Sequence, residues 1–201
     1  MSEIDAKIVA QLRAQTGAPI KDCRTALIET KGDIKSAVDV LRKRGIKAAE
    51  GLTDRAASEG LVASYVHHNG RIGCLAEVCC ETDFVARNEE FLAFCKQLCM
   101  HIAAARPRFL DRSSIDPAVL AKENEIATEQ TKLSMPGKPQ QVIDKAVEGR
   151  VAKFFGETCL LDQPWTFEPS TTVELALKAL AGKMGENLKI RRFARLELGG
   201  S

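Results

Sequence analysis

Seven cysteines and three histidines are the residues of this 201-residue chain whose chemistry could serve catalysis or metal binding. Cys74 lies on an apolar run that ends in a Cys-Cys pair, and Cys95 and Cys99 are one helical turn apart. With His67 or His101 these thiols could form a zinc site, but structural zinc sites normally show closely paired ligands, and no CxxC spacing occurs. The apolar surroundings instead predict buried, reduced thiols that act as small hydrophobic residues.

Other motifs for chemistry are missing from the sequence. It contains no Gly-rich nucleophile elbow, no GxxxxGK[ST] loop and no GxGxxG after a strand. His67-His68 beside an Asn-Gly pair is typical of a solvated loop tip. We therefore expect no enzyme, no catalytic residue, no bound metal and no cofactor. One enzymatic alternative remains open, a thiol- or zinc-dependent hydrolase that uses Cys74, Cys95 or Cys99.

Composition and charge indicate a cytoplasmic protein. Hydrophobic residues make up 45% and charged residues 28% of the chain, and 29 basic against 27 acidic residues leave a net charge of +2. The chain has no block of like charge and few aromatic residues, so we expect it not to contact nucleic acid directly. A nucleic-acid-binding module remains open as a third hypothesis. No apolar run reaches the roughly 18 residues that a membrane span needs, and MSEIDAKIVAQLR resembles no signal peptide.

The first 45 residues contain three segments with helical periodicity. Thr16-Gly17-Ala18-Pro19 ends the first and begins the second, Asp33 is placed to cap the third, and Gly45 is expected to end it. So small a unit would be marginally stable alone, which favours a docking role. The sequence predicts a three-helix docking module over 1–45 and a linker, or a loosely held helix, over 46–59.

A β-hairpin is predicted next, because Asn69-Gly70 is the preferred pair for a two-residue type I′ turn. Pairing across that turn aligns His67 with Ile72. Alternation then puts one set of residues on a core face: Leu61, Ala63, Tyr65, Ile72, Cys74, Ala76 and Val78.

The rest of the chain predicts helices and one more strand. Asn88 should cap a helix that runs to about Ala105, and Pro117 and Pro139 should begin the two arms of a helical hairpin, over 117–134 and 139–155. The segment LKIRRFARLEL alternates as a strand, with an expected core face of Leu188, Ile190, Ala194, Leu196 and Leu198. The fold class is therefore α+β: residues 60–201 form a core domain of about three antiparallel strands packed with helices and a helical hairpin at about 117–155.

The segment ETDFVARNEEF, residues 81–91, follows the apolar run CLAEVCC. Thr82 and Asp83 are typical turn residues, and two interpretations of Phe84 are open. Periodicity favours a phenylalanine folded back beneath the next helix as core. The alternative is a side chain displayed to a partner, and the residues alone predict that the chain acts by binding.

Several segments together resemble the elongation factor Ts family, in its short, single-core bacterial form. They are TGAPIKDCRTAL, GDIKSAVDVLRKRGIKAA, ETDFVARNEEF, MHIAAARPRF, KPQQVIDKAVEGRVAKFF and GENLKIRRFARLELG, in the family's order. The resemblance implies a ubiquitin-associated-like N-terminal module and a guanine nucleotide exchange factor for elongation factor Tu.

The same resemblance implies the contact residues. An exchange wedge of Thr82, Asp83, Phe84 and Val85 would enter near the magnesium and phosphate site of the GTPase. Further contacts would come from His101, Ile72 and Gly73, and from the N-terminal residues Arg13, Ile20, Lys21 and Arg24. Short members of the family pair as homodimers, so a two-plus-two complex with the GTPase is expected.

Overall fold

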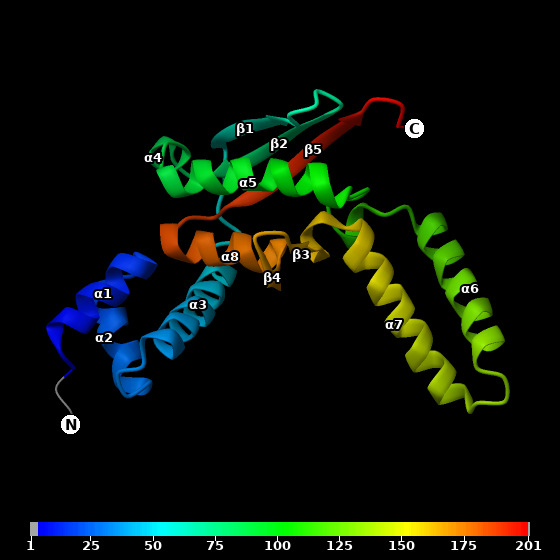
Figure 1. Cartoon of the computed structure of the whole chain (residues 1–201), viewed down its shortest axis with the longest axis horizontal. Helices are drawn as coiled ribbons and strands as arrows, with labels where there is room; N and C mark the ends of the chain where they lie inside the picture. Colours follow the sequence, from blue (N-terminus) through cyan, green and yellow to red (C-terminus); the bar gives the residue numbers. More distant parts are fainter. Residues whose placement is uncertain (1–3, 201) are drawn as a thin grey trace. The chain divides into compact units, whose positions relative to one another are not determined.

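The computed structural model describes residues 4–200 (Figure 1). These residues divide into two compact units. The first unit contains the described residues up to 61 together with 78–92 and 175–191. The second contains 62–77, 93–174 and the described residues from 192. The fold is α+β, as predicted, with an N-terminal helical module, a three-stranded sheet and a small two-stranded sheet.

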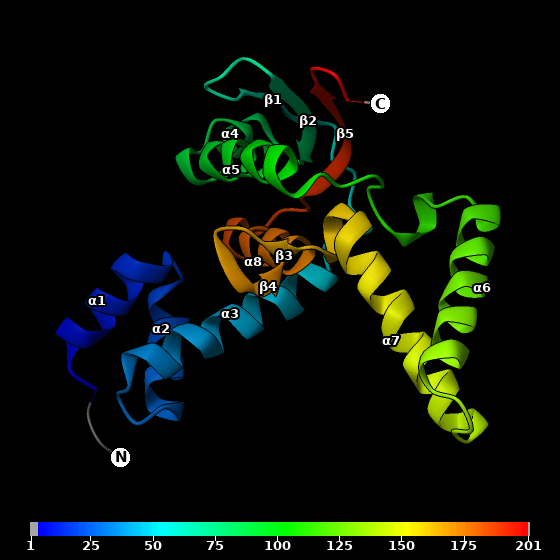
Figure 2. The same cartoon turned by 45° about the vertical axis from the view of Figure 1, so that its right-hand side comes forward.

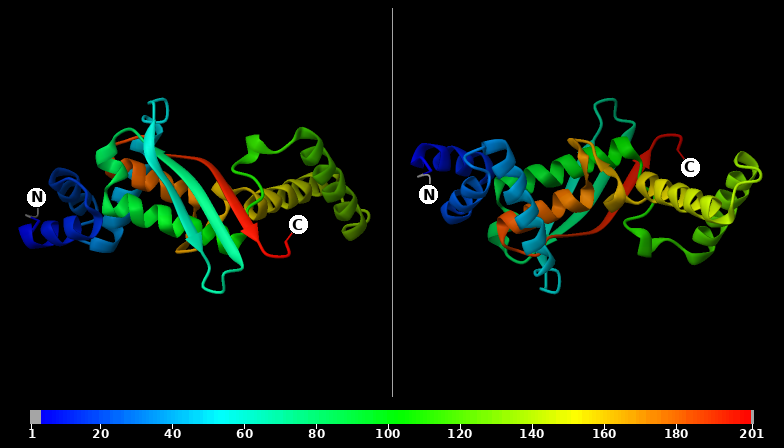
Figure 3. Two further views of the ribbon diagram at one scale, coloured as in Figure 1. Left: turned by 90° about the horizontal axis from the view of Figure 1, so that it is seen from above. Right: turned by 90° about the horizontal axis from the view of Figure 1, so that it is seen from below.

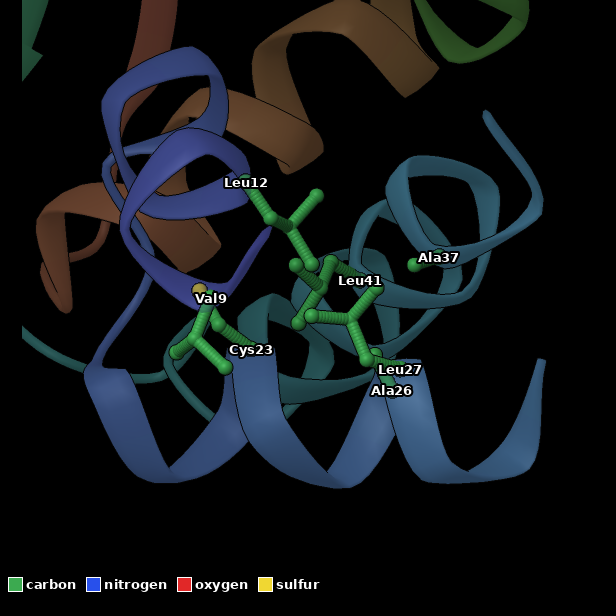
Figure 4. Packing of buried hydrophobic residues seen from close by; sticks show 7 residues of the cluster. All are labelled: Val9, Leu12, Cys23, Ala26, Leu27, Ala37 and Leu41. Carbon is green, nitrogen blue, oxygen red and sulfur yellow. The ribbon is translucent and has the colours of Figure 1, made fainter. Parts of the chain in front are cut away.

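The N-terminal module consists of α1 (Ala6–Thr16), α2 (Ile20–Glu29) and α3 (Ile34–Glu50) (Figure 2). Asp5 and Asp33 cap α1 and α3 through side-chain hydrogen bonds to backbone N–H groups, and Gly17 ends α1 in the left-handed conformation. The apolar faces of the three helices meet in one buried cluster (Figure 4): Val9, Leu12, Cys23, Ala26, Leu27, Ala37 and Leu41.

Helix α3 does not end at Gly45, as the sequence predicted, but continues to Glu50. The backbone of Gly45 lies where α3 meets α8 (Val173–Met184), and the residue that must be a glycine at this contact is Gly182 of α8. A Cβ atom on Gly182 would lie 2.1 Å from the carbonyl oxygen of Gly45. The helix therefore extends through residues 46–50 of the segment expected to be a linker.

Strands β1 (Glu59–Val66), β2 (Ile72–Cys80) and β5 (Lys189–Glu197) form the larger sheet in the order β1-β2-β5 (Figure 3). The predicted core face of the β1-β2 hairpin is confirmed by the burial of Ala63, Cys74, Ala76 and Val78, and by the hydrogen bond from His67 N to Ile72 O at 2.8 Å.

The predicted two-residue type I′ turn is wrong. Gly70 has a φ of 67°, but the non-glycine residues with positive φ in the described chain are Lys31 and Arg106, not Asn69. Gly70 N donates to His67 O, so the chain turns over His67–Gly70, and Asn69 Oδ1 accepts from Arg71 N at 3.0 Å. The Asx side chain stabilises a longer loop without a left-handed Asn69.

The predicted core face of β5 is correct only at its start, where Leu188 and Ile190 are buried. Arg191 and Arg192 are both exposed, which shifts the alternation by one residue. Leu196 and Leu198 are therefore exposed, and Arg195 turns inward to donate two hydrogen bonds to Ala103 O. The inward guanidinium is tolerated because it also pairs with Glu197 at 2.8 Å.

Helix α5 (Glu89–Ala105) begins at the predicted cap, where Asn88 Oδ1 accepts from Glu90 N at 2.8 Å. Helices α6 (Pro117–Ser134) and α7 (Gln140–Thr158) form the predicted hairpin (Figure 2). The small sheet of β3 (Pro164–Trp165) and β4 (Glu168–Thr172) was not predicted. Its Trp165 ring stacks on Phe94, with 5.4 Å between the ring centroids.

Candidate functional site

The turn after β2 displays an aromatic side chain. Thr82 caps the single-turn helix α4 (Asp83–Ala86), and its hydroxyl oxygen accepts a hydrogen bond from Val85 N at 3.4 Å. Asp83 pairs with Arg87 across one helical turn at 3.2 Å. Because the cap turns the chain out of the strand, Val85 is buried while the Phe84 side chain is 83% exposed.

The interpretation of Phe84 as a core residue is therefore wrong. Burying a phenylalanine contributes about 1.5–3 kcal/mol, and the chain makes almost none of that gain at this position. The prediction failed because it folded the side chain back beneath the helix that follows Asn88, whereas Phe84 belongs to a separate turn of helix that leaves it exposed. This turn, Thr82–Val85, is the candidate contact site.

A carboxylate from a distant part of the sequence holds the Thr82–Val85 turn. Glu186 Oε2 accepts hydrogen bonds from Glu81 N and Thr82 N, both at 3.1 Å, and Glu186 Oε1 accepts from Thr82 Oγ1 at 2.6 Å. The Cys80 thiol donates to Thr82 O at 3.1 Å. The backbone N–H, the carbonyl and the hydroxyl of Thr82 are thus all bonded, so the base of the turn is fixed from several sides.

Sequence reasoning did not identify Glu186. Its segment, GENLKIRRF, contributed to the family resemblance only as a motif, and the sequence contains no signal that connects it to a turn 104 residues earlier. The partner of a backbone amide is set by tertiary structure, which periodicity does not report.

Three of the four predicted N-terminal contact residues, Arg13, Ile20 and Arg24, line a groove in the three-helix module, and Lys21 does not. Arg13, Ile20, Lys21 and Arg24 are all exposed, and Ile20 keeps 57% of its surface accessible. The groove has a volume of about 780 Å³ and is lined mainly by α1 and the start of α2; its walls include Val9, Ala10, Arg13, Ala14, Ile20 and Arg24. The groove combines small and apolar side chains with the guanidinium groups of Arg13 and Arg24. Such a lining is complementary to a protein surface that carries apolar and acidic groups.

His101, Ile72 and Gly73 belong to the second unit. His101 is fully buried: its Nε2 lies 2.9 Å from Gln163 Oε1, and its Nδ1 lies 2.7 Å from Thr166 Oγ1. Burial lowers the pKa of His101 below its ordinary value, which keeps the ring neutral. Ile72 and Gly73 are half-buried, and a Cβ atom on Gly73 would meet no atom within 4 Å, so packing within the chain does not require glycine there.

All seven cysteines are buried free thiols, as predicted. Desolvation raises the pKa of the Cys80 and Cys99 thiols to about 11, and it also raises the pKa of Cys74 and Cys159. A raised pKa removes the thiolate that a nucleophile or a metal ligand needs. Across residues 4–200, no three His, Cys, Asp or Glu side chains gather in a way that could hold a metal ion.

The fold and the exposed residues together define an α+β protein whose distinctive surface features suit contact with another protein. No helix in the described part of the chain is long and apolar enough to cross a membrane.

Comparison with known proteins gives the family. The family model described as Elongation factor TS matches residues 46–200. Elongation factor Ts of Caldanaerobacter subterraneus subsp. tengcongensis is 50% identical over 98% of this chain and 97% of its own length. The protein of the same name from Geotalea daltonii is 50% identical over 98% of this chain and 90% of its own. The chain therefore belongs to the elongation factor Ts family and is a translation elongation factor.

Proposed function

We propose that this protein is a cytoplasmic guanine nucleotide exchange factor for elongation factor Tu, and that it acts without covalent chemistry of its own. The observation that carries the proposal is the 83% exposure of Phe84 on a turn whose base is fixed by hydrogen bonds. A rigid, exposed aromatic residue is suited to enter an apolar pocket of a partner, because little freedom is lost on binding.

The mechanism that we propose is differential binding. Thr82–Val85 enters the GTPase beside its magnesium and phosphate site, and insertion of Phe84 moves the elements that hold the magnesium ion. Loss of the ion leaves the phosphates less neutralised, so GDP leaves faster. Such a factor must bind the nucleotide-free GTPase better than the nucleotide-bound form. By linkage, an incoming nucleotide weakens binding of the factor by the same ratio, which lets GTP displace it.

The other predicted residues have distinct parts in this proposal. The three-helix module over 1–45 docks through the groove beside Arg13, Ile20, Lys21 and Arg24. Ile72 and Gly73 form a contact region in the second unit. Because the His101 ring is fully buried, we propose that it contributes by holding Thr166 and Gln163 in place.

We also propose that two copies of the chain associate, which gives a two-plus-two complex with the GTPase. The outward face of the sheet in the second unit supports this idea, because apolar side chains there are exposed: Val62 at 61%, Val66 at 67%, Leu75 at 50%, Leu196 at 77% and Leu198 at 67%. Exposed apolar patches of this kind mark interaction surfaces, and one patch pairing with its own copy makes a closed dimer.

The test of the exchange function follows release of labelled GDP from elongation factor Tu with and without this protein. Phe84→Ala should lower the exchange rate at least about tenfold, since truncating a central aromatic contact costs about 2 kcal/mol or more. Its free energy of unfolding should change by less than about 1 kcal/mol, because the side chain is exposed in the free protein.

Leu133→Ala is the matched control, because Leu133 on α6 is also 83% exposed and is outside the proposed site. It should exchange nucleotide at the rate of the unchanged protein. A wild-type protein that does not accelerate GDP release would refute the proposed function.

A further inference from the structure

Two pairs of adjacent residues, Glu81-Thr82 and Glu186-Asn187, hold the base of the Thr82–Val85 turn by hydrogen bonds in both directions. We call this arrangement the clamp. Glu186 accepts three hydrogen bonds from Glu81 and Thr82. In return, Glu81 Oε1 accepts a hydrogen bond from Asn187 N at 2.7 Å. Two short segments from opposite parts of the sequence thus bind each other through four hydrogen bonds, and all of these residues belong to the first unit.

The clamp also reaches the segment that follows the N-terminal module. The buried Asn187 side chain donates from Nδ2 to Thr53 O at 3.1 Å and to Arg55 O at 2.7 Å. Arg55 in addition lies 3.6 Å from Glu81 Oε1. The exit from α3 and the base of the Thr82–Val85 turn are therefore fixed by the same pair of residues.

The chemistry of Glu186 suits this position. An ionised carboxylate is an acceptor on both oxygens, so it can satisfy two backbone N–H groups and a hydroxyl at once. Hydrogen bonds to a charged acceptor are roughly twice as strong as neutral ones. Thr82 needs such a partner, because its hydroxyl donates to Glu186 while it accepts from Val85 N, and this orients the first turn of α4.

We propose that Glu186 is a positioning residue for nucleotide exchange: it sets the direction in which Asp83 and Phe84 leave the strand, and Thr82 transmits this direction to α4. The inference rests on the proposed exchange function. Glu186 holds the turn in its binding geometry before the partner arrives, so the partner does not have to order it. Its loss should therefore affect insertion of Phe84 more than docking of the N-terminal module.

The experiment compares Glu186→Gln with Thr82→Val and Thr82→Ser in the GDP-release assay over a range of protein concentrations. Glutamine keeps the size of the side chain but replaces one acceptor oxygen with a donor, and valine removes the hydroxyl that serine retains. Glu186→Gln and Thr82→Val should lower the maximal exchange rate about tenfold, the factor expected for a lost hydrogen bond to a charged group. The half-saturating concentration should change much less, and Thr82→Ser should lose much less of the maximal rate than Thr82→Val, because serine retains the hydroxyl that bonds to Glu186.

Two further measurements separate positioning from general damage. Glu129→Gln removes an exposed carboxylate of α6 outside the proposed site and should leave both exchange parameters unchanged. In the free protein, Glu186→Gln should speed amide hydrogen exchange of Glu81 and Thr82, the two N–H groups bonded to the carboxylate, while the melting transition stays cooperative.

The outcomes distinguish the two proposals. A wild-type protein without exchange activity refutes the proposed function itself. If the wild-type protein is active and Glu186→Gln has the same maximal exchange rate, only the positioning role is refuted. Unchanged protection of the Glu81 and Thr82 amides in that variant also refutes only the positioning role. Equal losses in Thr82→Ser and Thr82→Val would refute it as well, because the hydroxyl would then not be what matters.

Discussion

Replacing Gly182 with alanine tests the packing of α3 against α8. The new Cβ atom would lie 2.1 Å from the carbonyl oxygen, 2.5 Å from the carbonyl carbon and 2.6 Å from the Cα atom of Gly45. All three are backbone atoms, so no side-chain rotation relieves the overlap, and one helix must move.

The expected magnitude follows from two opposing effects. Alanine favours a helix interior over glycine by about 1 kcal/mol, whereas overpacking a close contact costs about 1–3 kcal/mol. The new Cβ atom cannot rotate away from its own backbone, and the atoms that it meets are backbone atoms of Gly45. We therefore expect the overpacking cost to lie in the upper part of its range, which leaves a net destabilisation of about 1–2 kcal/mol.

Gly149→Ala in α7 is the matched control, because a Cβ atom there meets nothing within 4 Å. It should stabilise the protein by about 0.5–1 kcal/mol. Gly45→Ala is a second control at the same crossing: its Cβ atom would lie 3.8 Å from Ala179 O, an ordinary contact, so it should also stabilise the protein by about 0.5–1 kcal/mol. Urea unfolding followed by far-ultraviolet circular dichroism measures all three. A Gly182→Ala variant as stable as Gly149→Ala would refute the close contact.

Two further predictions concern the second unit. Because burial lowers the pKa of His101, the unfolded chain takes up a proton below about pH 6.5 that the folded chain does not, and stability should fall as the pH falls through this window. His101→Gln should flatten the change in melting temperature between pH 7.5 and 5.5, and an unaltered slope would contradict the buried neutral ring. Leu196→Glu on the outward sheet face should convert a dimer to a monomer in size-exclusion chromatography with light scattering, whereas Val142→Glu on α7 should not. A wild-type protein that elutes as a monomer would contradict the proposed pairing.

The sequence predicted the helices well because their ends are local. Asp33, Asn88 and Asp116-Pro117 each begin a helix through contacts within a few residues, so the cap alone locates the start. The position and alternation of the β1-β2 hairpin were equally predictable because both are local, although the Asn-Gly pair indicated the wrong type of turn.

The failed predictions depended on distant parts of the chain. Gly45 resembles a helix end until α8 is placed against it, and the alternation of β5 shifts because Arg195 finds Ala103 O and Glu197 as inward partners. Strands β3 and β4 were missed because they are two and five residues long.

The candidate site shows the same division. Phe84 could be singled out from its neighbours, but its exposure depends on how Thr82 begins α4. Glu186, which fixes that start, can be recognised only once the chain has folded.

The sequence separation of the clamp has a consequence for the order of synthesis. The turn at Thr82 is made early, but the carboxylate that fixes it comes 104 residues later and just before the last strand. A nascent chain that has not reached Glu186 can form the three-helix module from local contacts, yet it lacks the partner that orients Phe84. Contacts of such long range form late and slowly. Incomplete chains on the ribosome can thus fold their docking module before they have a formed Thr82–Val85 turn, and the turn becomes ordered only after synthesis has passed Glu186.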